Sequence, residues 1–102
     1  MKILTESVQF KADQKLHDFI EKKMEKLTTF FDKIIKAEVK LRLENSGQVK
    51  DKVAEIQLHV PGQNLFAKET AKTFEQSVDS AVDNLRRQLA KYKEKQREQS
   101  EA

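Results

Sequence analysis

The chain has 102 residues, of which 37% are hydrophobic and 36% charged, and 20 Lys and Arg against 17 Asp and Glu give a net charge of +3. This length supports one domain with one core, and the lack of Cys excludes disulfides, thiolate metal sites and thiol nucleophiles. Because there is neither a secretion signal nor an apolar run of about 18 residues, we expect a cytoplasmic domain over residues 1–97 and a disordered polar tail over 98–102.

The first part of the chain predicts a strand followed by a long helix. Residues 2–8 favour a short strand, and Asp13 is suited to cap a helix that reaches about Phe31. The helix is predicted from apolar residues at three- and four-residue spacing, which are Leu16, Phe19, Ile20, Met24, Leu27, Phe30 and Phe31. Its polar flanks differ in sign, with Lys15, Lys22, Lys26 and Lys33 on one side and Asp18, Glu21 and Glu25 on the other. Lys23 falls within the apolar arc, so it must reach an edge or the neighbouring helix.

The middle of the chain alternates with a period of two, which predicts strands with one buried and one wet face. The buried face of the first strand comprises Ala37, Val39, Leu41 and Leu43, and that of the second Ala54, Ile56, Leu58 and Val60. Asn45, Ser46 and Gly47 are expected to turn the chain between them. Pro61 and Gly62 suit a type II turn, so residues 65–69 should return as a further strand.

A second long helix is predicted over residues 73–97, with Thr73 as its N-cap. Its apolar stripe is formed by Phe74, Val78, Ala81, Val82, Leu85, Leu89 and Tyr92. The acids lie in its first half, and six bases against one acid lie over residues 84–97. Two or fewer bases satisfy a helix macrodipole, which is equivalent to about half a charge, so the excess indicates a surface for a polyanion.

Together these elements predict an α+β fold in the order β-α-β-β-β-α. A four-stranded sheet is expected to carry both helices on one face, as a two-layer sandwich. The outer face of the sheet carries mixed charge, so the cationic surface should come from the helices.

The sequence offers no arrangement of residues typical of an enzyme. Asp79 and Asp83 are spaced for a carboxylate pair, but Arg86 and Arg87 follow one turn later and should pair with Asp83. His17 and His59 are isolated, and no glycine-rich loop is available for a phosphate. We therefore expect no catalytic residues, no cofactor and no metal.

Three segments carry a resemblance to a known family. They are KMEKLTTFFDKI around the end of the first helix, LHVPGQNLFAKET at the second hairpin, and VDSAVDNLRRQLAKYKEK in the last helix. Over nearly all of residues 1–97 the chain resembles the short forms of the ribosome hibernation promoting factor family, also called ribosome-associated translation inhibitors. The resemblance implies a domain that docks on the small ribosomal subunit, in the channel used by messenger RNA and transfer RNAs. There it would block translation and preserve idle ribosomes, as in stress or stationary phase.

The resemblance also implies that basic helix faces meet ribosomal RNA. The positions expected to do so are Lys22, Lys23, Lys26, Arg86, Arg87, Lys91, Lys93, Lys95 and Arg97. The chain should be a monomer off the ribosome, with no membrane or small-molecule partner. Within the family, the resemblance is to a short form, so we expect neither the C-terminal dimerisation domain of the long forms nor the extended tail of the inhibitor subtype.

Two alternatives remain open at this level. A double-stranded RNA-binding domain also packs two helices on a sheet, but its bases are expected at the start of the second helix, which here is TFEQSVD. A protein interaction module would use its charges only for solubility, and its binding would be insensitive to salt.

Overall fold

The computed structural model describes the backbone of residues 1–46 and 49–101, and side chains over 1–44 and 51–97. The elements in chain order are β1 (Lys2–Val8), α1 (Gln14–Phe30), β2 (Lys36–Ser46), β3 (Val49–Val60), β4 (Gln63–Ala71) and α2 (Phe74–Glu101). This order confirms the predicted β-α-β-β-β-α fold.

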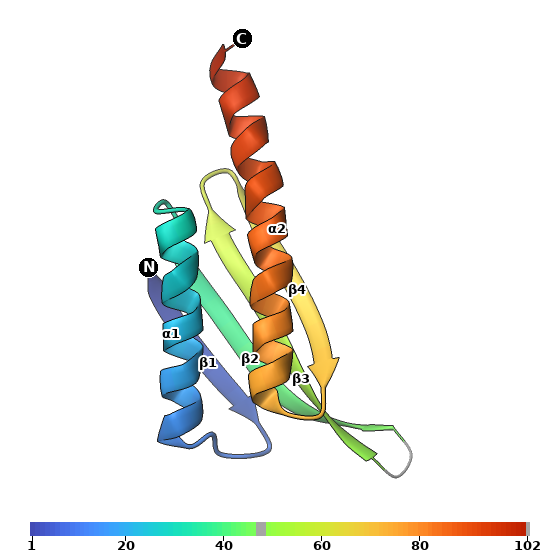
Figure 1. The fold of residues 1–102 in the computed structure, drawn as a ribbon. Coiled ribbons are helices and arrows are strands. Elements are labelled where there is room, and N and C mark those ends of the chain that lie inside the picture. Colours follow the sequence, from blue (N-terminus) through green and yellow to red (C-terminus); the bar gives the residue numbers. More distant parts are fainter. Residues whose placement is uncertain (47–48, 102) are drawn as a thin grey trace.

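The strands form one sheet in the order β1-β2-β3-β4, in which β1 is parallel to β2 and the other pairs are antiparallel. The parallel pair requires a crossover, and α1 supplies it across one face. Helix α2 lies beside α1 on the same face, and both helices run in the same direction (Figure 1). The carboxyl-terminal end of α1 therefore lies beside the second half of α2.

Local sequence signals account for the ends of these elements. The Asp13 carboxylate accepts a hydrogen bond of 2.8 Å from the Leu16 N–H, and the Thr73 hydroxyl accepts one of 3.1 Å from the Gln76 N–H. Both residues cap a helix as predicted. Gly62 has φ +86, the value that a type II turn needs after Pro61, and only two residues separate β3 from β4.

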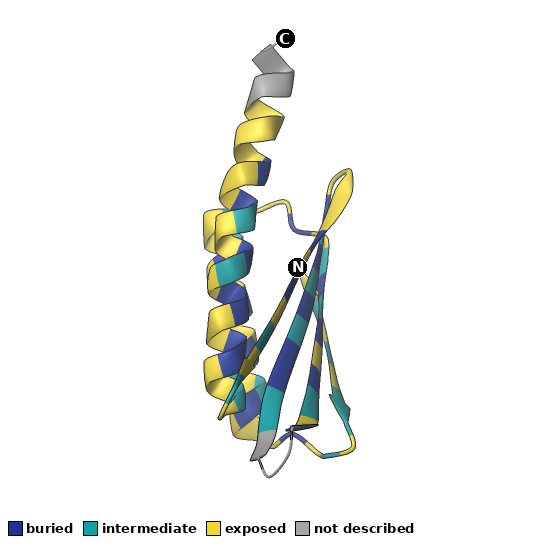
Figure 2. Cartoon of the chain, turned by 90° about the vertical axis from the view of Figure 1, so that its right-hand side faces the viewer, coloured by how far each residue is buried: buried dark blue, intermediate teal, exposed yellow. Residues whose placement is uncertain are grey.

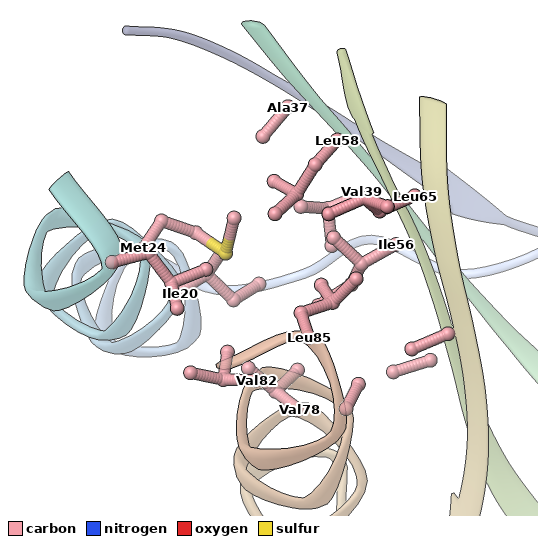
Figure 3. Close-up of a cluster of buried hydrophobic side chains, with 14 of the residues drawn as sticks. Ile20, Met24, Ala37, Val39, Ile56, Leu58, Leu65, Val78, Val82 and Leu85 are labelled. Carbon is pink, nitrogen blue, oxygen red and sulfur yellow. The ribbon is translucent and has the colours of Figure 1, made fainter. Parts of the chain in front are cut away.

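The core lies between the two helices and the inner face of the sheet (Figure 2). Figure 3 shows Ile20 and Met24 of α1 pointing toward Leu85 of α2 and toward inward side chains of the strands. Ile20, Met24 and Leu85 are fully buried. Each such side chain contributes about 1.5–3 kcal/mol when it leaves water, so this shared core fixes how the helices sit.

Three details differ from the sequence-based expectation. Asn45 and Ser46 pair with β3 as the last residues of β2, so they are not part of the turn, and Gly47 lies outside the described residues. Phe30, which was expected in the core, leaves 36% of its surface exposed because Phe31 packs inward instead. Helix α2 continues to Glu101, beyond the expected limit at Arg97, and the boundary between domain and tail stays a prediction.

Tyr92 ties α2 to the hairpin between β3 and β4. Its ring meets Phe31 edge to face at 5.4 Å, and its hydroxyl donates a 2.6 Å hydrogen bond to the Pro61 carbonyl. This contact joins residues 31 positions apart, and helical spacing alone predicts only that Tyr92 is buried.

We predict that Tyr92→Phe lowers the free energy of unfolding by about 0.5–1.5 kcal/mol, the usual net contribution of one hydrogen bond. Urea denaturation followed by circular dichroism measures the change. Phe31→Leu is the control that keeps the hydroxyl and removes the edge-to-face contact. An unchanged midpoint for Tyr92→Phe would show that the hydroxyl contributes nothing to stability.

Candidate nucleic-acid interface

Two lysine contacts bridge the helices along their shared seam. Asp79, Arg86 and Lys93 recur every seven residues, so they lie on one ridge of α2. Lys23 of α1 reaches across to this ridge, with its Nζ 2.7 Å from Asp79 Oδ1 and 5.5 Å from the centre of the Phe19 ring. This confirms that Lys23 reaches the neighbouring helix, where it pairs with an acidic side chain.

Lys93 makes the second bridge, at the carboxyl-terminal end of α1. Its Nζ donates a 3.0 Å hydrogen bond to the Phe30 carbonyl and lies 4.5 Å from the centre of the Phe30 ring. Helix α1 has no basic residue in its own last turn. Because carbonyl groups at a helix end carry a partial negative charge, α2 supplies the cation that α1 lacks.

A groove of about 380 Å³ lies between these two bridges. Its basic members are Lys23, Lys26 and Arg86, and its acidic members are Asp79 and Asp83. Arg86 Nη2 lies 3.6 Å from Asp83 Oδ1, as expected from their spacing. Both of these side chains are mostly exposed, so the pair is weak and leaves Arg86 accessible to an anion.

A second hollow of about 430 Å³ lies farther along α2. It is lined by Phe30, Ala90, Lys91, Lys93, Glu94 and Arg97. Three bases here meet only one acid, whereas the inter-helix groove has three bases and two acids. The positive excess thus grows toward the carboxyl-terminal ends of both helices.

Six of the nine predicted RNA-binding residues therefore line these two hollows, and three do not. Lys22 lies nearer the start of α2, in a hollow with Lys15, Asp18, Phe19 and Glu75, where acids balance bases. Arg87 lines neither hollow, although it precedes Lys91 by four residues and so lies on the same side of α2, one turn earlier. Lys95 follows Gln88 by seven residues, and the Gln88 side chain donates to the Phe66 carbonyl of β4, so this ridge faces β4 and not α1.

Several of the predicted residues have no acidic partner among the side chains that the structure describes. Within the described side chains, no ion pair is made by Lys22, Lys26, Arg87, Lys91 or Lys95. An unpaired exposed cation binds a phosphate without the free-energy cost of breaking an existing ion pair. Lys26 and Lys91 combine this property with a place in the hollows.

The outer face of the sheet has a different electrostatic character. Glu6, Lys40, Glu55 and Lys68 lie in register across the four strands, with alternating sign. A shallow hollow of about 400 Å³ on this face also includes Leu4 and Phe66. Alternating charges largely cancel at a distance, so a polyanion is attracted to the helices and not to this face.

His59 is less isolated than the sequence indicated. Its Nε2 lies 3.3 Å from the Glu38 carboxylate without the alignment of a hydrogen bond, and Lys36 Nζ lies 3.4 Å from the same carboxylate. Contact with His59, and then with Lys36, holds the pKa of Glu38 below its usual value. The stabilisation from Glu38 is therefore present at neutral pH and lost as the pH falls through that lowered pKa.

Other kinds of site have little support in residues 1–46 and 49–101. No three His, Asp or Glu side chains there gather as metal ligands. No helix in the same ranges has both the length and the hydropathy to cross a membrane.

Residues 3–97 match the family described as Sigma 54 modulation protein / S30EA ribosomal protein. The chain belongs to this family. Among curated S30EA relatives, the ribosome hibernation promoting factor of Klebsiella oxytoca is 34% identical over 80 residues, which cover 78% of this chain and 80% of the relative. The ribosome hibernation promotion factor of Picosynechococcus is 34% identical over 97 residues, which cover 93% of this chain and 50% of the relative. The chain thus spans half the length of the second relative, and the predicted family is confirmed.

Solved structures agree on the S30EA fold. The Thermus thermophilus Protein Y N-terminal domain superposes with a TM-score of 0.79 at 27% identity, over 90% of this chain and 99% of that one. A ribosomal subunit interface protein from Coxiella burnetii gives a TM-score of 0.81 at 22% identity, over 91% and 98% of the two chains. At that lower identity the likeness shows the fold alone.

We predict that Lys93→Glu destabilises the domain by about 1–2 kcal/mol, because it removes the cation from the carboxyl end of α1 and places a carboxylate there. Lys95→Glu, two residues away, should change stability by less than about 0.5 kcal/mol. Thermal and urea denaturation of both variants measure the difference. Equal stabilities would show that the contact between Lys93 and Phe30 contributes nothing to the free energy of unfolding.

Proposed function

We propose that this protein is a ribosome hibernation factor that binds the small ribosomal subunit through the basic surface of its two helices. One observation carries the proposal: in an S30EA-family chain, six predicted RNA-binding residues from α1 and α2 line two adjoining hollows. Relatives named ribosome hibernation promoting factor support the same role. The proposed site on the ribosome is the channel for messenger RNA and transfer RNAs, where the bound domain blocks translation.

The distribution of charge suits ribosomal RNA. Phosphate groups repeat along an RNA strand, and several cations on a rigid support release several counterions at once. Lys26 comes from α1 and Lys91 from α2, and the common core keeps their distance constant. The balanced charges of the outer sheet face favour one orientation, with the helices toward the RNA.

The proposed mode of action is occupation of space and not catalysis. The protein acts in the compartment that holds the ribosomes, as a monomer before it binds, with residues 1–97 as the ribosome-binding domain. It needs no metal or cofactor. The ribosomal RNA of the small subunit is the partner that the cationic helices recognise.

The position of the bases favours this role over a double-stranded RNA-binding domain. Near the start of α2, Glu75 shares a hollow with Asp18, and Asp79 pairs with Lys23. The bases with few acidic neighbours lie toward the other end, around Lys91 and Arg97. A domain that places the start of its second helix on duplex phosphates requires the opposite arrangement.

We predict that the double variant Lys26→Glu, Lys91→Glu folds normally and loses most of its affinity for small subunits. With about five phosphate contacts, the parent should show a log–log slope of affinity against salt of about −3.5 to −4.5. Two contacts fewer should reduce the magnitude of this slope by about 1.4–1.8. Sedimentation with small subunits over a salt series measures both quantities, and a cell-free translation reaction measures the inhibition.

The matched control changes the acidic flank of α1 through Asp18→Asn, Glu21→Gln and Glu25→Gln. This variant should bind and inhibit at least as well as the parent, because none of these residues lines the two basic hollows and the loss of negative charge does not weaken attraction to phosphates. Full binding by the folded Lys26, Lys91 double variant would place the RNA on another surface. A parent slope near zero would favour the protein interaction module.

Occupied transfer RNA sites should exclude the protein, since the proposal has it fill the same space. We predict that small subunits preloaded with messenger RNA and transfer RNAs in the aminoacyl and peptidyl sites retain much less protein than empty subunits. Sedimentation at fixed salt measures the retained fraction. Equal retention on loaded and empty subunits would show that the protein binds the ribosome at a site outside this channel.

A further inference from the structure

Phe30 is an aromatic residue with an exposed ring in the middle of the basic surface. It ends α1 and leaves 36% of its surface exposed, while its neighbour Phe31 packs against Tyr92 in the core. Among the residues that the structure describes, Phe30 alone lines both the inter-helix groove and the hollow beyond it. Single exposed apolar side chains are common on protein surfaces, so what distinguishes Phe30 is its place between two groups of cations and not its exposure alone.

The surroundings of the ring resemble those used to hold an unpaired nucleotide. Lys26 and Arg86 line the groove on one side of Phe30, and Lys91 and Arg97 line the hollow on the other. Lys93 Nζ stands over the ring at 4.5 Å from its centre. Proteins that bind single strands combine a cationic path for the phosphates with an aromatic ring on which a base stacks.

We propose that Phe30 is a stacking position for one unpaired nucleobase of the bound RNA. The Lys and Arg side chains of the two hollows bind the flanking phosphates. The proposal rests on the proposed function and adds to it the kind of RNA that the site accepts. A base within a duplex has both of its faces covered by neighbouring bases. Phe30 therefore selects a single-stranded or bulged segment, whereas Lys26 and Lys91 recognise any phosphate.

The alternative explanation for the ring is purely structural. Phe30 could serve only to hold Lys93, whose ammonium group also bonds the Phe30 carbonyl. The two roles differ in what they require of the RNA. Stacking needs the base itself, whereas a correctly held Lys93 needs only a phosphate.

The first test compares Phe30→Leu with the parent on two probes of about twelve nucleotides, an oligouridine and an abasic strand of the same length. Leu keeps apolar bulk beneath Lys93 and removes the aromatic face. Fluorescence anisotropy should show oligouridine binding weakened about 5- to 150-fold, which corresponds to the ~1–3 kcal/mol of one stacked base. Abasic binding and the salt slope should be unchanged, and Phe30→Tyr should bind both probes like the parent.

A second variant reports on stacking directly and does not depend on a change of affinity. The chain contains no Trp, so Phe30→Trp introduces a single indole whose fluorescence belongs to this position alone. Oligouridine should quench this fluorescence because the base stacks on the indole, and the abasic strand should not. Denaturation curves of both variants confirm that the domain remains folded.

The outcomes separate this proposal from the function on which it rests. Equal weakening of both probes by Phe30→Leu would show that the ring only positions Lys93 and would overturn the stacking role. Unchanged oligouridine binding by Phe30→Leu together with an unquenched indole would overturn it as well. In either case, continued sensitivity of ribosome binding to Lys26→Glu and Lys91→Glu would leave the proposed function standing.

Discussion

The packing of two parallel helices on one face of a single sheet is the constraint from which the other features of this protein follow. The crossover from β1 to β2 directs α1 along the sheet, and the return from β4 directs α2 beside it in the same sense. Their apolar stripes share one core, so the polar flanks of the two helices meet along a seam. Lys26 of α1 and Arg86 of α2, about 60 residues apart in sequence, thereby line the same groove.

Parallel helices also bring their negative carbonyl ends toward the same side of the molecule. At the end of α1, Lys93 of the neighbouring helix compensates this negative charge through its contacts with the Phe30 carbonyl and ring. A lysine that contributes to the basic surface thus also completes the end of a helix. Lys23 has a similar double character through its short contact with Asp79. Charge on this surface is therefore divided between holding the helices together and meeting a partner.

The division has a direction along the seam. Near the start of α2, acids such as Glu75 and Asp79 offset the lysines of α1. Farther along, around Lys91 and Arg97, bases outnumber acids. The sheet contributes no competing field, because Glu6, Lys40, Glu55 and Lys68 alternate in sign across it. The excess of positive charge accordingly lies on one face of the protein and, on that face, toward one end.

The sequence by itself determined the elements, their order and their buried faces. Apolar spacing, the caps at Asp13 and Thr73, and the Pro61–Gly62 turn depend on interactions within a few residues, which a single chain segment specifies. The candidate RNA-binding residues could also be proposed from the sequence, because a surplus of basic residues on a helix is visible without knowledge of packing. Which of them lie together was decided only in the tertiary structure, since the rotation of each helix about its axis depends on how both stripes fit the sheet. The exposure of Phe30, the bridges from Lys93 and Lys23, and the contact between His59 and Glu38 all join residues distant in sequence, and only the packed core brings such residues together.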